Sequence, residues 1–204
     1  VRDLVTAQVS FLVVGGTGSG KTTLLSALLG EADAAQRLLV IEDTAELKPN
    51  HPHVVSLVAR RSNAEGRGEI TMDALLRQAL RMRPDRIIVG EIRGAEVVDL
   101  LAALNTGHDG GAGTLHANSL AEVPARMEAL AALGGLDRAA LHSQLAAAVH
   151  VAFTTERGRD GGRRLAQIGL LEGNPVRARA VWSAEGGPRE GFAEFAAELS
   201  GRLS

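Results

Sequence analysis

The chain has 204 residues, a length that fits one domain or slightly more. Apolar residues make up 45% and charged residues 23%, as in globular proteins that bury a core. Cysteine is absent, which excludes a disulfide framework, a thiolate zinc site and a cysteine nucleophile. No apolar run approaches the roughly 18 residues of a membrane span, and no basic leader precedes one, so we expect a cytoplasmic protein.

Charge and aromatic content argue against a nucleic-acid partner. The formal net charge is -2, and aromatic residues make up only 2% of the chain. Proteins that track a nucleic-acid strand combine a basic groove with aromatic stacking platforms. We therefore expect no nucleic acid among the partners.

Strands and helices are predicted to alternate along most of the chain. Short apolar runs bounded by glycine or acidic residues predict buried strands at 10–14, 38–41, 54–59, 86–89 and 114–115. Helical spacing and capping signals predict helices at 2–8, 21–29, 95–105, 119–132 and 137–148, and a further helix that Thr71 caps and Pro84 ends. This alternation predicts an α/β fold with a mainly parallel sheet and helices on both of its faces.

The last part of the chain has a different pattern. Residues 149–155 and 163–171 predict an antiparallel hairpin, 176–182 predicts a third strand, and 192–203 a terminal helix. We therefore expect a core at 1–148 and a C-terminal β extension with its helix at 149–204. Four arginines gather at the hairpin, which predicts a charged turn or, alternatively, a contact with a neighbouring subunit or anionic lipid: Arg157, Arg159, Arg163 and Arg164.

A phosphate-binding motif follows the first predicted strand. The pattern G-x-x-x-x-G-K-[ST] is matched at every fixed position by Gly15, Gly16, Thr17, Gly18, Ser19, Gly20, Lys21 and Thr22. Glycines let successive backbone N–H groups point at a phosphate, and the following helix adds its positive end. Lys21 would reach the β- and γ-phosphates, and the Thr22 hydroxyl would ligate Mg²⁺. The motif predicts binding of a nucleoside triphosphate such as ATP.

Acidic residues end two of the predicted buried strands. Glu91 comes just after the strand predicted at 86–89. In phosphate-loop enzymes, a strand next to the loop strand delivers an acid to the metal in this way. The usual aspartate position is occupied here by Gly90. Glu42, Asp43 and Glu46 follow the strand at 38–41. Such close carboxylates repel unless a cation compensates, and one of them could orient or deprotonate an attacking water. The alternative interpretation is a solvated acidic loop.

Four blocks together resemble the type II/type IV secretion ATPase superfamily, with most similarity to its tight-adherence (Flp) pilus branch. They are GGTGSGKTT at 15–23, IEDTAEL at 41–47, LRMRPDRIIVGEIRGAE at 80–96 and NTGHDGGAGTLHANS at 105–119. The resemblance implies a RecA-like core that hydrolyses ATP with Mg²⁺ to power pilus assembly or protein secretion.

The resemblance also implies roles for individual residues. Glu46 matches a general base for the lytic water, Glu91 a glutamate that supports Mg²⁺ through its water shell, and His116 a sensor of the γ-phosphate. Arg60 lies where the family places an arginine after the third strand, which would meet the γ-phosphate charge, and Thr23 completes the phosphate-binding block.

At the level of the whole protein, the resemblance implies a homo-oligomer, a hexamer in the intact protein. It further implies an inner-membrane platform protein as partner, with the motor held at the inner face of the cell membrane. Family members carry an N-terminal domain that helps to close the nucleotide site, and this chain begins shortly before the first predicted strand, so we expect that domain to be absent from it.

Two other functions stay open at this point. One is a nucleic-acid translocating ATPase built on the same core, which the charge and the aromatic content disfavour. The other is a nucleotide-gated binding module with little turnover.

Overall fold

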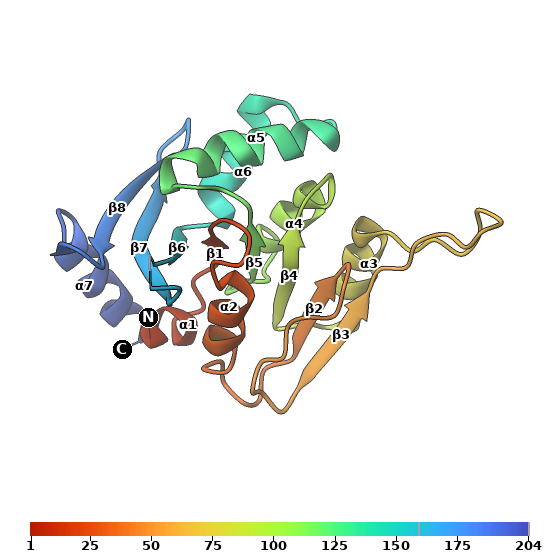
Figure 1. Ribbon diagram of the computed structural model, residues 1–204, viewed down its shortest axis with the longest axis horizontal. Helices are drawn as coiled ribbons and strands as arrows, with labels where there is room; N and C mark the ends of the chain where they lie inside the picture. Colours follow the sequence, from red (N-terminus) through yellow and green to blue (C-terminus); the bar gives the residue numbers. More distant parts are fainter. Residues whose placement is uncertain (159, 204) are drawn as a thin grey trace.

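The computed structural model of the chain describes residues 1–158 and 160–203 (Figure 1). Arg159 of the predicted arginine cluster and Ser204 lie outside the described residues. The strands are β1 (Phe11–Val14), β2 (Leu38–Glu42), β3 (Val54–Val58), β4 (Arg86–Ile92), β5 (Ala112–Leu115), β6 (Val151–Arg157), β7 (Arg163–Glu172), β8 (Arg177–Ser183) and β9 (Gly187–Pro188). The helices are α1 (Arg2–Thr6), α2 (Lys21–Leu29), α3 (Met72–Ala79), α4 (Glu96–Leu104), α5 (Val123–Leu133), α6 (Arg138–Ala148) and α7 (Phe192–Leu203), with 3₁₀ turns η1 (Leu80–Met82) and η2 (Leu120–Glu122).

One sheet runs through the molecule in the order β3-β2-β4-β5-β1-β6-β7-β8-β9. The strands from β3 to β6 in this order pair in parallel, and those from β6 to β9 pair antiparallel. Every residue of β1 and β2 is buried, which accounts for their unbroken apolar sequence. The predicted parallel α/β core with a C-terminal antiparallel extension is therefore confirmed.

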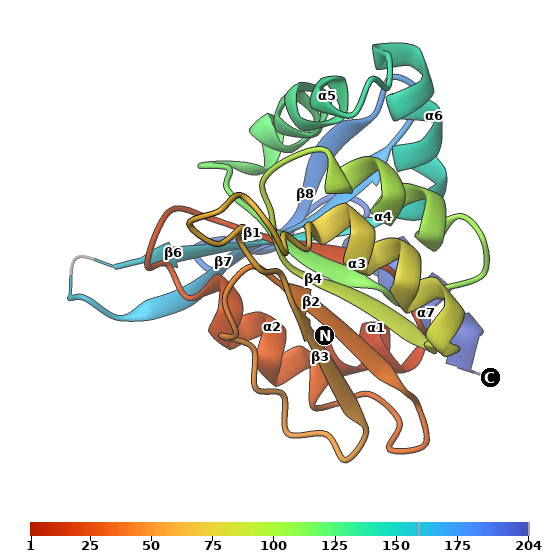
Figure 2. The same ribbon diagram turned by 90° about the vertical axis from the view of Figure 1, so that its right-hand side faces the viewer.

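Helices cover both faces of the sheet (Figure 2). On one face, α3 to α6 pack into a core that includes Leu76, Leu101 and Met127. On the other face, α1 and α2 pack around Leu4 and Leu25, and α7 adds partly buried phenylalanines. No helix in the described part of the chain is both long enough and apolar enough to cross a bilayer.

The strand predicted at 86–89 is longer than expected. In the structure, β4 continues through Gly90 and Glu91 to Ile92. The reason lies in the neighbouring strand, because Ile92 pairs with Leu115 of β5 after a shift in register that follows Val89. Glu91 therefore lies on an ordered strand rather than in the loop beyond it.

The segment between β3 and α3 extends away from the body as an arm (Figure 1). Its base is an antiparallel bridge between Arg60 and Ile70, and its turn is held by the Asn63 side chain, which accepts from the N–H groups of Glu65 and Arg67. Residues 60–71 are all exposed. The arm is therefore shaped by hydrogen bonds within itself rather than by packing against the core.

The carboxyl ends of the central parallel strands meet at one edge of the sheet. The glycine loop follows β1, Glu42 ends β2, Glu91 lies near the end of β4, and His116 follows β5. In parallel α/β sheets this edge is where ligands bind. The topology therefore brings together residues that are far apart in the sequence.

The opposite edge is held by a buried arginine. Arg86, at the start of β4, is only 1% exposed. Its guanidinium donates to the carbonyls of Val5 (2.6 Å) and Gly110 (3.1 Å) and to Oε1 of Gln36 (2.8 Å). Buried polar groups need such partners, so this one side chain joins α1, the loop before β5 and the loop before β2.

Replacing Arg86 with alanine should strongly destabilise the fold. The change leaves buried acceptors without a donor, at about 1–3 kcal/mol for each unsatisfied group, and we expect a loss of about 3 kcal/mol in the free energy of unfolding. Urea denaturation of the Arg86→Ala protein measures this loss in the free energy of unfolding. The control is Arg81→Ala, because Arg81 is an exposed arginine in η1. Equal midpoints for the two variants would refute this role.

Candidate functional site

The glycine loop between β1 and α2 adopts a conformation that only glycine accepts readily. Gly18 and Gly20 have φ angles of 71° and 99°, in the left-handed region. Gly20 immediately precedes the first residue of α2, Lys21. The loop therefore curls ahead of a helix N-terminus, the geometry in which backbone N–H groups bind an anion.

Strand β6 supports the loop from one side. A Cβ on Gly15 would lie only 2.5 Å from the Thr155 carbonyl oxygen, so no side chain fits there. The hydroxyl oxygens of Ser19 and Thr155 are 2.8 Å apart, and Ser19 Oγ also donates to the Gly16 carbonyl at 2.9 Å. The shape of the loop thus depends on a strand that lies more than a hundred residues further along the chain.

The Lys21 ammonium lies within the loop. Its Nζ donates to the carbonyls of Gly15 (2.9 Å) and Gly16 (3.0 Å), and the residue is 7% exposed. Burial lowers the pKa of Lys21 below its ordinary value, and the Glu91 carboxylate partly opposes that shift. The cation is held close to where the loop would receive a phosphate.

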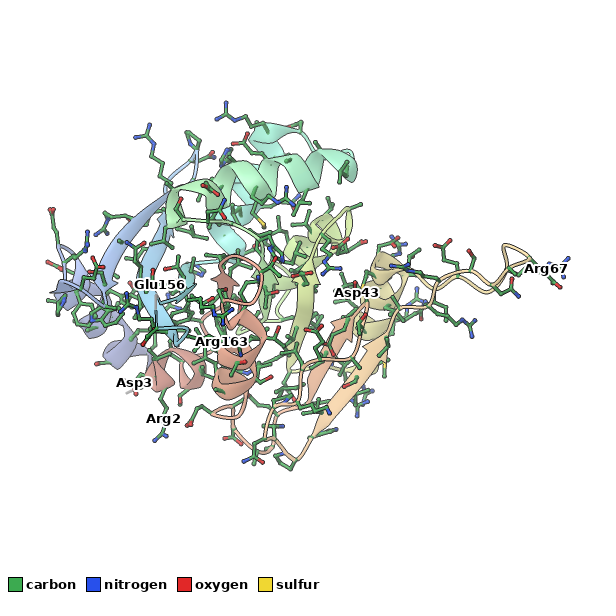
Figure 3. The ribbon with its side chains drawn as sticks, in the orientation of Figure 1. Arg2, Asp3, Asp43, Arg67, Glu156 and Arg163 are labelled. Carbon is green, nitrogen blue, oxygen red and sulfur yellow. The ribbon has the colours of Figure 1, made fainter. Side chains whose placement is uncertain are left out.

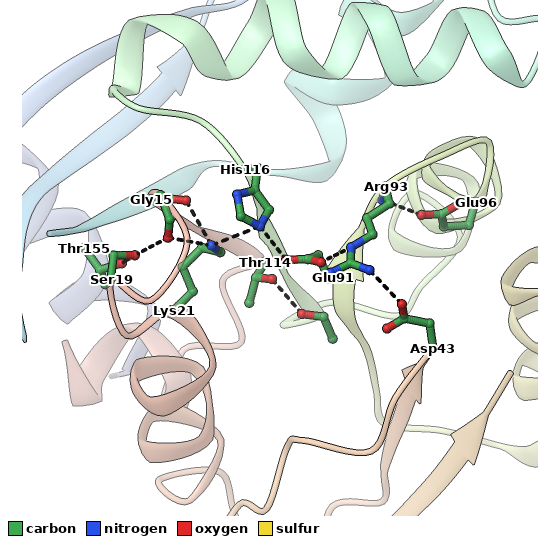
Figure 4. Close-up of polar contacts among 12 residues, drawn as sticks. Gly15, Ser19, Lys21, Asp43, Glu91, Arg93, Glu96, Thr114, His116 and Thr155 are labelled. Atoms are coloured by element: carbon green, nitrogen blue, oxygen red, sulfur yellow. Dashed lines mark hydrogen bonds and ion pairs between the residues drawn. The ribbon is translucent and has the colours of Figure 1, made fainter. Parts of the chain in front are cut away.

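His116 and Glu91 lie beside the Lys21 ammonium (Figure 4). His116 Nε2 is 2.8 Å from Oε1 of Glu91 and 3.4 Å from Nζ of Lys21. Because a carboxylate only accepts, we assign the hydrogen to Nε2, which donates it to Glu91. Lys21, His116 and Glu91, predicted from separate motifs, thus lie together.

A second cationic side chain, Arg93, completes this cluster. Arg93 Nε forms an ion pair with Oε2 of Glu91, and its Nη1 donates to Oδ2 of Asp43 at 2.8 Å. Glu96 fixes the local backbone by accepting from the N–H groups of Arg93 (2.6 Å) and Gly94 (2.9 Å). The ends of β2 and β4 are therefore joined by alternating charges.

Glu42 is the buried member of the acidic run after β2. It is 3% exposed, and its Oε1 accepts from the N–H groups of Glu46 (3.1 Å) and Leu47 (2.9 Å). Its Oε2 has no hydrogen-bond partner within the described residues. A Cβ on Gly90 would lie 2.5 Å from Cγ of Glu42, which explains physically why glycine occupies the usual aspartate position.

A cavity of about 370 Å³ opens at this edge of the sheet. The predicted site residues that line it are Thr17, Gly18, Gly20, Lys21, Thr22, Thr23, Glu46, Glu91 and His116. Gly15, Gly16 and Ser19 form the rest of the loop beside it. Its lining also includes Glu42 and Asp43 of the predicted acidic run, together with Thr44, Gly90, Arg93 and Arg163.

Arg60 lies apart from this cluster. It lines a neighbouring cavity of about 460 Å³ at the base of the arm. Its Nε donates to the Gly68 carbonyl at 2.6 Å, so the side chain folds back onto the arm. In this structure Arg60 is therefore not brought to the glycine loop.

The arginines of the hairpin separate into different environments. Arg164 pairs with Glu156, with Nη2 and Oε1 2.6 Å apart. Arg163, its neighbour on β7, instead lines the cavity beside Gly20. The charged-turn interpretation therefore does not describe Arg163. Successive side chains of a strand point to opposite faces of the sheet, so the sequence could have predicted that Arg163 and Arg164 differ in their surroundings. It does not indicate which of them faces the loop.

Comparison with known proteins adds an independent finding. The family model described as type II/IV secretion system protein matches residues 1–155. A putative conjugal transfer protein of Mycobacterium tuberculosis is 63% identical over 207 residues, which cover 100% of this chain and 58% of the relative.

Two solved structures share the fold. The VirB11 ATPase of the Brucella suis type IV secretion system, in complex with sulphate, superposes with a TM-score of 0.72 and 34% identity over 82% of this chain and 49% of its own. The pilus retraction motor PilT with bound ADP superposes with a TM-score of 0.62 and 28% identity, over 84% of this chain and 50% of its own. The chain thus spans about half the length of these two proteins. By sequence and by fold, it belongs to the type II/IV secretion system protein family.

Proposed function

We propose that this chain binds and hydrolyses ATP with Mg²⁺, as the motor part of a pilus-assembly or secretion machine. The observation that carries the proposal is the convergence of Lys21, His116 and Glu91 beside the glycine loop, with 3.4 Å between Nζ and Nε2 and 2.8 Å between Nε2 and Oε1. A cation, an imidazole and a carboxylate beside a glycine loop at a helix N-terminus fit the transfer of a phosphoryl group to water.

The loop has the features that a phosphate requires. Its glycines leave the backbone accessible, and Lys21 is held beside it by carbonyls that a bound phosphate would replace as partners. Two relatives support this interpretation, because VirB11 was solved in complex with sulphate, an anion shaped like phosphate, and PilT with bound ADP.

The acids around the cavity fit a magnesium ion that also uses phosphate oxygens and water. No group of three or more His, Asp or Glu side chains in the described part of the chain forms a cage that would hold a metal alone. Thr22 would ligate the ion, Glu91 would hold it through its water shell, and Oε2 of Glu42, which has no hydrogen-bond partner within the described residues, offers a further acceptor. A bound Mg²⁺ would supply positive charge that offsets the negative charge developing on the phosphate oxygens.

Glu46 suits the role of general base better than Glu91. The carboxylate of Glu91 already contacts the Arg93 guanidinium and the His116 imidazole. Glu46 is exposed, lines the cavity, and its carboxylate has no polar partner within the described residues. We propose that Glu46 takes the proton of the attacking water, while His116 reports the state of the γ-phosphate.

For the whole protein we propose a homo-oligomer, hexameric in its intact form, which acts on an inner-membrane platform protein from the cytoplasmic side. Arg60, on the exposed arm, would then meet the γ-phosphate charge only after a rearrangement or within the assembly. These proposals rest on the family to which the chain belongs.

Replacing Lys21 with alanine should abolish turnover. We expect phosphate release from Mg-ATP to fall about 100-fold or more, because the charge nearest the loop is lost. The matched control is Lys48→Ala, since Lys48 is the second lysine of the chain, is exposed and lies outside the cavity lining. Equal rates for wild type and Lys21→Ala would count against the site, and tight ATP binding without turnover would favour a nucleotide-gated binding module.

Replacing Glu46 and Glu91 by glutamine should impair two different properties, the rate of turnover and the Mg²⁺ requirement. Glu46→Gln should keep nucleotide binding while lowering turnover about 100-fold, the usual contribution of a general base. Glu91→Gln should raise the Mg²⁺ concentration that half-maximal turnover requires. Turnover measured against Mg²⁺ concentration distinguishes them, with Glu194→Gln on α7 as control. A Glu46→Gln protein as active as wild type would refute Glu46 as the base.

A further inference from the structure

We propose that Arg163 binds phosphate oxygens of the nucleotide from the side of the glycine loop opposite Glu91. This inference rests on the proposed function, because it concerns a further contact in the same cavity. Sheet order defines the two sides: β4, which carries Glu91, lies beyond β5 on one flank of β1, and β7 lies beyond β6 on the other. In Figure 3, Arg163 lies toward the β6–β7 side and Asp43 toward the β2–β4 side.

The stem of Arg163 lies directly against the loop. A Cβ built on Gly20 would be 3.3 Å from Cβ of Arg163 and 3.2 Å from its Cδ. Arg163 also lines the cavity, together with Thr17, Gly18 and Lys21. The side chain therefore reaches the segment whose backbone would surround a phosphate.

The hairpin that carries Arg163 is fixed to the loop. Thr155 of β6 pairs with Leu165, and Arg157 pairs with Arg163 at the next position on the same face. Thr155 is also the residue whose hydroxyl lies 2.8 Å from that of Ser19. The position of Arg163 thus follows from the same strand pairing that supports the loop.

Among the cationic side chains that line the cavity, Arg163 alone lacks a polar partner in the described part of the chain. Lys21 donates to two loop carbonyls, and Arg93 pairs with Glu91 and Asp43. Arg163 forms no side-chain hydrogen bond or ion pair within residues 1–158 and 160–203. Its neighbour Arg164 pairs with Glu156 and does not line the cavity. One arginine of the adjacent pair is thus neutralised, and the other is available to a ligand.

The charges around the cavity are unevenly distributed. All four acids in its lining follow or end β2 and β4, namely Glu42, Asp43, Glu46 and Glu91. The hairpin side contributes Arg163 and no acid. A metal would be held on the acidic side, so the oxygens facing the hairpin would need another cation. The planar guanidinium suits two oxygens of one phosphate group.

Nucleotide binding by Arg163 variants tests the inference. We expect Arg163→Ala to weaken the binding of Mg-ATP and Mg-GTP alike by about tenfold, as for a lost charge-assisted hydrogen bond, and Arg163→Lys to restore part of the affinity. Affinities are measured by calorimetry at low and high salt, with melting temperatures to show that each variant is folded. Arg164→Ala is the matched control and should bind like wild type.

The remaining outcomes contradict the inference in different ways. Wild-type affinity in Arg163→Ala, together with loss of binding in Lys21→Ala, would overturn the role of Arg163 and leave the proposed function standing. A loss for ATP but not GTP, without rescue by lysine, would assign Arg163 to the base and overturn the phosphate contact. A wild-type protein that binds no nucleotide would overturn the proposed function and this inference with it.

Discussion

The ammonium group of Lys21 is the point on which the rest of the site depends. Two carbonyls of its own loop hold it, so it occupies a buried position without direct contact to a carboxylate of the described residues. Burial of a cation is costly unless its donors are satisfied, and here backbone oxygens accept from two of its three N–H groups. One positive charge is thus surrounded by the glycine loop, the start of α2 and the ends of β4 and β5. An anionic ligand could replace the two carbonyls as the partners of this charge.

The two flanks of this charge differ in chemistry. Toward β2 and β4, carboxylates alternate with Arg93 and His116, and one oxygen of Glu42 has no hydrogen-bond partner among the described residues. Toward β6 and β7, the groups beside the loop are the Thr155 hydroxyl and Arg163. A metal and a water fit the first flank, and phosphate oxygens fit the second, so one polyphosphate could satisfy both.

Local patterns in the sequence predicted most of the fold and the residues around Lys21. Strands buried on both faces are unbroken apolar runs, and the loop motif has a fixed spacing. The sequence therefore predicts β1, β2 and the glycine loop directly. The features that it does not predict depend on contacts between neighbouring strands. The burial of Glu42 follows from the missing Cβ of Gly90 on a neighbouring strand, and β4 passes Gly90 because β5 pairs with Ile92. Likewise, only the β6–β7 register places Arg163 at the cavity.

The same reasoning changes how the C-terminal extension is understood. Val14, the last residue of β1, pairs with Thr154, and the Thr155 hydroxyl donates to the Val14 carbonyl. The Thr155 carbonyl also lies so close to Gly15 that any side chain there would displace the strand. The loop cannot keep this shape if β6 moves, and β6 cannot move without its partner β7. The antiparallel hairpin therefore forms one wall of the glycine loop, and a shift in the loop has to be accommodated by the hairpin that bears Arg163.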